Sequence, residues 1–225
     1  MLVGMSAPSA ETGTPALGLR ARKKAQTRQN ISNTATRLFL DRGYDNVTIA
    51  EIAQAAEVAK MTVTNYFPRK EDLVLDIHDA FVAGPATAVR ERQPGESALA
   101  ALRRAYLAAV AAKDAVLAGF SGPDFAALIT GSPALVARLR EFHEDRERHL
   151  FQVLAEETGS TADDFAARIA AALLSGVHRV LFEEVLRRTV AGEPNEAIAA
   201  SLAERVAAAF DTLEPALGDY AVRTN

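Results

Sequence analysis

The basic side chains of this 225-residue chain are concentrated near its start. Residues 19–70 hold ten lysine and arginine residues against four acidic ones, although the whole chain carries a net charge of −4. Lysine and arginine pair with phosphate groups, so a basic segment joined to an acidic remainder is typical of a protein in which one domain contacts nucleic acid. The alternative is a chance cluster of charges on a solvated face.

Four of these basic residues lie before or at the very start of the first predicted helix: Arg20, Arg22, Lys23 and Lys24. They could follow a DNA backbone or enter the minor groove as an arm. They could equally be an ordinary basic leader, because the residues before them are small and turn-forming and show no periodicity. We assign residues 1–21 to a disordered leader and leave both interpretations open.

Two short helices are predicted inside the basic segment. Thr48 followed by Glu51 is a capping-box pattern that begins the first, and the second runs from about residue 59 to residue 66, where Pro68 ends it. A longer helix over residues 22–41 precedes them. Two short helices joined by a tight turn and braced by a third form a helix-turn-helix, whose second helix fits the DNA major groove.

The remainder of the chain is helical in pattern, with no strand-like alternation. Further helices are expected over residues 71–82 (ended by Gly84-Pro85), 96–112, 133–157, 161–189 and 195–213. The sequence therefore predicts an all-α fold.

Motifs for catalysis, cofactors and metals are missing from the sequence. There is no cysteine, no HExxH, no glycine-rich phosphate loop and no serine elbow, and His143 and His149 do not share a helix face. We predict no enzyme activity, no cofactor and no metal. No signal peptide is recognisable and uninterrupted apolar runs are short, so we expect a cytoplasmic chain with no membrane partner. Two alternatives are an all-α enzyme and a helical adaptor whose basic segment only keeps it soluble.

The stretch from Arg28 to Leu73 resembles the DNA-binding domain of TetR/AcrR-type transcriptional regulators. The resemblance rests on residues at that family's spacing: Gly43-Tyr44, Ile52-Ala53, Tyr66-Phe67 and Lys70. Glu57 departs from it, because the family usually has glycine in this turn. The resemblance implies a three-helix DNA-binding domain over residues 22–69 and a helical effector-binding and dimerisation domain over residues 70–225.

The resemblance also implies which side chains contact double-stranded DNA. Those expected to face base edges lie on the second short helix: Lys60, Met61 and Thr64. Those expected to contact phosphates or sugars are Thr48, Thr62, Asn65, Tyr66 and Lys70. The alternative for each polar residue is a solvated helix face.

In the family, the C-terminal part holds a small-molecule effector and dimerises through its last two long helices. The resemblance thus implies a homodimeric repressor that an effector releases from a palindromic operator. The apolar stripes of residues 161–189 and 195–213 suit such an interface. They could instead be core within one chain.

An effector pocket would be lined by aromatic and polar residues of the second domain: Tyr106, Phe120, Phe125, Phe142 and His178. Aromatic residues at helical spacing are more often core. The charged run over residues 138–149 favours a solvated face, with a polar effector contact through Arg146 or His149 as the alternative.

Overall fold

The computed structural model describes residues 18–160 and 165–224. Its elements in chain order are α1 (Leu19–Arg42), α2 (Ile49–Ala55), α3 (Lys60–Tyr66), the 3₁₀ turn η1 (Glu71–Leu73), α4 (His78–Arg90), α5 (Ala98–Ala112), α6 (Pro123–Gly131), α7 (Pro133–Glu157), α8 (Phe165–Val190) and α9 (Asn195–Leu217). No strand occurs in these residues, and the predicted all-α fold is confirmed.

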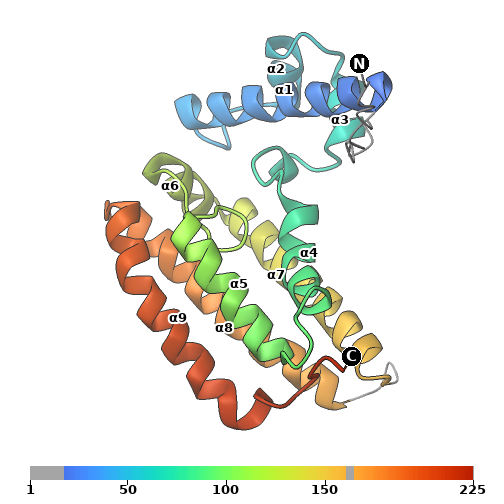
Figure 1. Cartoon of the computed structure of the whole chain (residues 1–225). Coiled ribbons are helices and arrows are strands. Elements are labelled where there is room, and N and C mark those ends of the chain that lie inside the picture. Colours follow the sequence, from blue (N-terminus) through green and yellow to red (C-terminus); the bar gives the residue numbers. More distant parts are fainter. Residues whose placement is uncertain (1–17, 161–164, 225) are drawn as a thin grey trace, which may run out of the picture.

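The helices fall into two groups (Figure 1). The first three lie together at one end, and the longer helices α5, α7, α8 and α9 run alongside one another below them. The helix α4 leads out of the first group and packs along α7, while α6 contacts α1, α7 and α8. The first three helices are therefore supported by α4 and by one end of the bundle.

Apolar packing continues from the first group into the second. One buried cluster includes Ile31, Phe39 and Val63 of the first three helices and extends to Phe81 of α4 and Phe142 of α7. Another fills the space between α5, α8 and α9. Because the first cluster crosses residue 69, the core itself marks no boundary there, and the predicted division of the chain at that residue stays a prediction.

The helix expected over residues 71–82 is wrong at both ends. Residues 71–73 form only a 3₁₀ turn, and α4 begins at His78 and continues through Gly84-Pro85 to Arg90. Proline lacks the amide that would bond to the carbonyl of Phe81, four residues back. The helix nevertheless continues because it packs along α7 and buries Phe81, Pro85 and Val89, and such packing outweighs local propensity.

The N-terminal helix begins earlier than expected. It starts at Leu19 and not at residue 22, so four basic residues lie within its first two turns: Arg20, Arg22, Lys23 and Lys24. Alanine, arginine, lysine and glutamine favour helix, which explains the extension. Residues 19–24 are thus helical, which leaves open whether they contact DNA, and residues 1–17 of the predicted leader lie outside the described residues.

The last two helices differ in what they bury. On α9, Ile198, Leu202, Val206 and Phe210 are buried and the helix packs along α5, so this stripe is core within the chain. On α8, which is described from Phe165 rather than from residue 161, Phe165 is 72% exposed. Val180, further along the same helix, is 60% exposed. The stripe on α9 is therefore core within one chain, which was the alternative to a subunit interface. The helix α8 instead keeps apolar side chains at the surface.

By length and composition, α8 could also cross a membrane. A single helix of this kind is weak evidence, since core helices of soluble proteins pass the same test. Here the helix packs along both α7 and α9. We therefore treat it as a member of the bundle.

Candidate nucleic-acid interface

A capping box begins the helix-turn-helix. The Thr48 hydroxyl accepts from the amide of Glu51 at 3.2 Å, and the Glu51 carboxylate accepts from the amide of Thr48 at 2.8 Å. Arg42, at the end of α1, donates to the same carboxylate at 2.5 Å. This hydrogen bond from Arg42, with those from Thr48, lowers the pKa of Glu51 to about 2. The predicted box is confirmed, and it also ties α2 to α1.

The turn between α2 and α3 carries a left-handed residue. Glu57 has φ 56°, and the following amide, that of Val58, donates to the Ala53 carbonyl at 3.0 Å. A side chain in this conformation costs on the order of 1 kcal/mol relative to glycine. The position where the sequence departs from the TetR pattern is therefore one that favours glycine, and the turn forms nonetheless.

The recognition helix α3 is anchored on one side and open on the other. Val63 and Phe67 are buried at 0% and 1% exposure and hold it against α1 and α2. The three residues expected to face bases are exposed on its outer side: Lys60, Met61 and Thr64. In the described part of the chain no acidic group pairs with Lys60, which leaves its ammonium available to an external acceptor.

The residues expected at phosphates have varied surroundings. Asn65 is exposed, whereas Thr62 and Tyr66 are half-buried. Lys70 donates to the Tyr44 carbonyl at 2.6 Å and lies over the Tyr44 ring, and burial lowers its pKa. Together with Thr48 in the capping box, Lys70 already has partners within the chain. Whether any of these residues contacts DNA stays a prediction.

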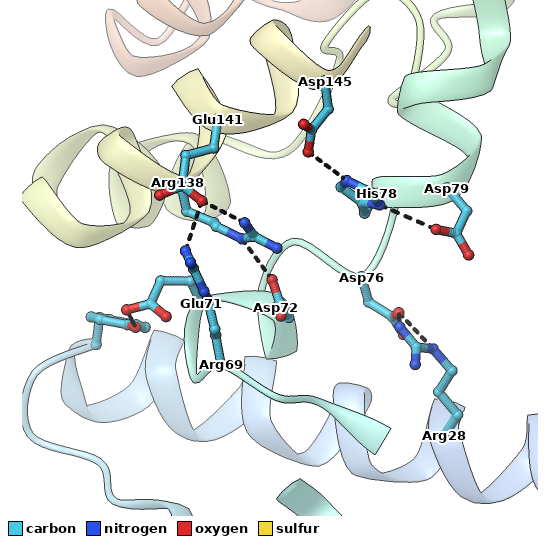
Figure 2. Close-up of polar contacts among 11 residues, drawn as sticks. Arg28, Arg69, Glu71, Asp72, Asp76, His78, Asp79, Arg138, Glu141 and Asp145 are labelled. Atoms are coloured by element: carbon cyan, nitrogen blue, oxygen red, sulfur yellow. Dashed lines mark hydrogen bonds and ion pairs between the residues drawn. The ribbon is translucent and has the colours of Figure 1, made fainter. Parts of the chain in front are cut away.

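A polar layer that sequence reasoning missed joins the helix-turn-helix to the bundle (Figure 2). Arg28 of α1 pairs with Asp76 at 2.5 Å, directly before α4. Arg138 of α7 pairs with Asp72 at 2.8 Å, and His78 contacts Asp145 of α7 at 3.2 Å. The partners lie 48 to 67 positions apart. No local spacing could have identified them.

The predicted pocket residues come together only in part. Tyr106 and His178 are buried side by side with ring centroids 5.2 Å apart. Phe142 lies nearby, with its centroid 6.1 Å from that of Phe81. Phe120 belongs to the cluster of α5, α8 and α9, and Phe125 borders the other cluster. None of the five lines the cavity of about 440 Å³ between α6, α7 and α8.

Sequence reasoning also placed most of the charged run of α7 on the surface. The structure buries His143 and Arg146 at 8% and 1% exposure. A signal was present, because Leu139, Phe142, Arg146 and Leu150 follow one another at helical spacing on the buried face. The run is therefore solvated on one side only.

Comparison with known proteins agrees with this geometry. Residues 31–77 match the family model described as bacterial regulatory proteins, tetR family. The chain is 34% identical over 192 residues to the HTH-type transcriptional regulator TcmR of Streptomyces glaucescens, an overlap of 78% of this chain and 83% of that protein.

Solved structures share the fold. A SmeT–triclosan complex is similar with a TM-score of 0.55 at 16% identity, covering 89% of this chain and 96% of SmeT. NalD of Pseudomonas aeruginosa is similar with a TM-score of 0.51 at 20% identity, covering 83% of this chain and 97% of NalD. The relationship to TcmR and the match to the family model establish that the chain belongs to the tetR family of bacterial regulatory proteins.

Proposed function

We propose that this chain is a homodimeric repressor that binds a palindromic operator and releases it when a small molecule binds in the helical bundle. Family membership makes it a DNA-binding transcriptional regulator. The observation that best supports the proposal is the open outer face of α3, whose polar side chains lie on a helix anchored from behind. We expect it to act in the cytoplasm, without a cofactor and without catalytic activity.

The DNA contacts proposed for α3 are those expected from the sequence. Lys60, Met61 and Thr64 face base edges, because they occupy its exposed side. Thr62, Asn65 and Tyr66 hold phosphates or sugars, while Thr48 and Lys70 lie at the flanks. A lysine ammonium can donate to the acceptors of guanine in the major groove.

The basic start of α1 also favours a phosphate partner. Arg20, Arg22, Lys23 and Lys24 are exposed in its first two turns, and this helix has no acidic residue in its first turn. Cations at a helix N-terminus lie at the positive end of the helix dipole, which is unfavourable. A phosphate group there would offset both the dipole and the side-chain charges.

A second copy of the chain is the proposed occupant of the exposed face of α8. Its exposed apolar residues repeat along one side of the helix: Phe165, Ile169, Leu173 and Val180. Large apolar side chains repeated on one helix face are typical of a subunit interface. Dimerisation also fits the DNA, since paired half-sites give one short recognition helix the specificity that it lacks alone.

The route from effector to DNA runs through α4. Phe81 of α4 is fully buried, and its ring lies 5.0 Å from that of His143 and 5.6 Å from that of His178. The residues just before α4 pair with α1 and α7 through Asp76 and Asp72. A ligand that displaces Phe81 would therefore shift α4 and change the separation of the two recognition helices.

The DNA part of the proposal is tested by an electrophoretic mobility shift with DNA from next to the encoding gene. We expect Lys60→Ala and Tyr66→Ala each to weaken operator binding about tenfold, because each removes a direct contact. Arg104→Ala, an exposed arginine of α5 paired with Glu96, is the control and should bind as the wild type does. Failure of the wild type to bind any such fragment at low salt would contradict the proposal.

The dimer is tested by sedimentation equilibrium. We expect the wild type to sediment as a dimer and Val180→Glu as a monomer, because the substitution places an unpaired carboxylate in the interface. Ala111→Glu, at an exposed position of α5, should leave the mass unchanged. A monomeric wild type would rule out this use of α8.

A further inference from the structure

A buried guanidinium lies where four helices of the bundle meet. Arg146 of α7 is 1% exposed. Its Nη1 lies 2.8 Å from Nδ1 and 2.5 Å from Nε2 of His178 on α8, and its Nη2 donates to the Tyr106 hydroxyl on α5 at 3.1 Å. The ring of Phe81 on α4 lies 4.6 Å from its Cζ. Tyr106 and Phe81 are uncharged, and the surroundings of His178 keep its imidazole neutral.

The neutrality of His178 follows from its hydrogen bonds. Its Nε2 lies 3.0 Å from the Leu117 carbonyl, to which it must donate. Its Nδ1 is then the acceptor for Arg146, as in an unprotonated imidazole. Burial, and next the charge of Arg146, keep the pKa of His178 well below its ordinary value. Arg146 thus carries the only charge at the centre of this cluster.

The other buried arginines in the described residues each form an ion pair with a carboxylate. Arg92, 2% exposed, pairs with Glu157 at 2.7 Å, and Arg188, 8% exposed, pairs with Glu193. For Arg146, no carboxylate of the described residues lies within 4.0 Å, and its Nε has no hydrogen-bond partner there. A guanidinium buried without an anion is costly, since buried charges in proteins are normally paired.

A cavity of about 440 Å³ opens at the surface between α6, α7 and α8, and Arg146 is not among the residues that line it. Its inner wall is apolar, with Leu139 and Leu186, and it also includes His143. The Nε2 of His143 is buried and has no partner in the described residues, and its ring lies 5.4 Å from that of His178. His143 therefore separates the cavity from the Arg146 cluster.

We propose that Arg146 and His143 form an anion-recognition site, and that the effector is a largely apolar molecule with one anionic oxygen group such as a carboxylate. The apolar body would occupy the cavity against Leu139 and Leu186. The anionic group would accept from the free Nε of Arg146 and from His143, after a rotation of the His143 side chain. The proposal deepens the proposed function and depends on it for the identity of the ligand as an effector.

The chemistry favours an anion over a neutral polar group. A carboxylate supplies the missing counter-charge and accepts the unused N–H of the guanidinium, and such charge-assisted hydrogen bonds are about twice as strong as neutral ones. The lining of the cavity adds the exposed Arg140, together with two residues that are already paired, Arg187 with Glu184 and Glu183 with Arg179. A cationic ligand with its charge at Arg146 would meet an uncompensated guanidinium instead of a counter-charge.

The test uses a matched pair of probes, 2-naphthoate and its neutral analogue 2-naphthamide, titrated calorimetrically into the full-length chain at neutral pH without DNA. We expect the wild type to bind the acid about tenfold more tightly than the amide, and Arg146→Gln to lose that preference. Arg104→Gln is the matched control and should keep it. Equal affinity for both probes, or no binding of the acid at millimolar concentration, would overturn the proposal.

A second measurement needs no variant at the buried site. The Nε–H signal of Arg146, assigned through its own side-chain carbons by NMR of the wild type, should move downfield with the acid and stay in place with the amide. If Arg140→Gln or Arg187→Gln abolishes the preference while the Arg146 signal does not move, the anion is bound at the mouth and the proposal fails. Neither assay contains DNA. A failure of the wild type to bind operator DNA would therefore contradict the proposed function without changing the results of these two assays.

Discussion

Arg92 and Arg146 are the two largest fully buried side chains described in this chain, and their surroundings differ in charge. Arg92 follows the end of α4 and donates to the carbonyls of Val89 and Ala221 as well as to the Glu157 carboxylate. It thereby holds the C-terminal segment, near the point marked C in Figure 1, against the bundle. Arg146 has only neutral partners and an unused Nε.

The difference separates two reasons for burying an arginine. At Arg92 the guanidinium is neutralised by Glu157 and also donates to the Ala221 carbonyl, so the residue stabilises the fold. At Arg146 the desolvation of the charge is not offset by an anion, so the residue costs stability in the free protein. Costs of that kind are typical of binding sites, which hold polar groups ready for a ligand.

The largest effect is expected at the structural arginine. Arg92→Met should lower the free energy of unfolding by about 2–4 kcal/mol, because it breaks a buried ion pair and leaves the Ala221 carbonyl without its side-chain donor. Urea unfolding followed by circular dichroism measures the change. Arg104→Met, at an exposed ion pair, should change it by less than about 1 kcal/mol. A similarly small loss for Arg92→Met would show that its ion pair is not structural.

Replacing Arg146 should change the free energy of unfolding in the opposite direction. Arg146→Met removes a buried, uncompensated charge and keeps most of the side-chain volume, so we expect the free energy of unfolding to rise by about 1–2 kcal/mol. Part of the gain is offset because Tyr106 and His178 each lose a hydrogen-bond partner. Urea unfolding under the same conditions decides the sign. A loss of more than about 1 kcal/mol would mean that these hydrogen bonds outweigh the desolvation of the charge.

Local signals in the sequence were enough to predict the helix-turn-helix. The capping box of Thr48 and Glu51, the positive-φ Gly43 after α1 and the buried spacing of α3 all lie within a few residues of what they determine. The bounds of α7 were predictable for the same reason, since Pro133 is its first residue and Gly159 follows its end. Where the physical cause is local, sequence reasoning succeeds.

The buried site could not be predicted because its causes are not local. Tyr106, Arg146 and His178 lie on three helices, and only their packing brings them together. The sequence placed Tyr106 and His178 among pocket candidates but could not show that both contact Arg146. The same limit explains α4, where Gly84-Pro85 signals an end that packing along α7 overrides.

The smallest expected effect is on the pH dependence of stability, which should involve the surroundings of Arg146 and not those of Arg92. Burial, and then the charge of Arg146, lowers the pKa of His143 to about 3, and burial likewise lowers that of His178. In the unfolded chain a histidine takes up its proton near pH 6.5, so below that pH the unfolded state binds protons that the folded state does not. Stability is therefore retained above about pH 6.5 and lost as the pH falls toward 3.

Each of these two histidines should remove about 1 kcal/mol of stability between pH 6.5 and pH 5.5. His143→Phe fills the same buried space without a titrating group, so it should lose about 1 kcal/mol less than the wild type over this interval. Urea unfolding at the two pH values measures the difference. Arg92→Met should keep the full wild-type dependence, because neither histidine is among the partners of Arg92. An unchanged dependence in His143→Phe would mean that the folded protein accepts a proton at His143, and that the neighbouring Arg146 charge is already compensated.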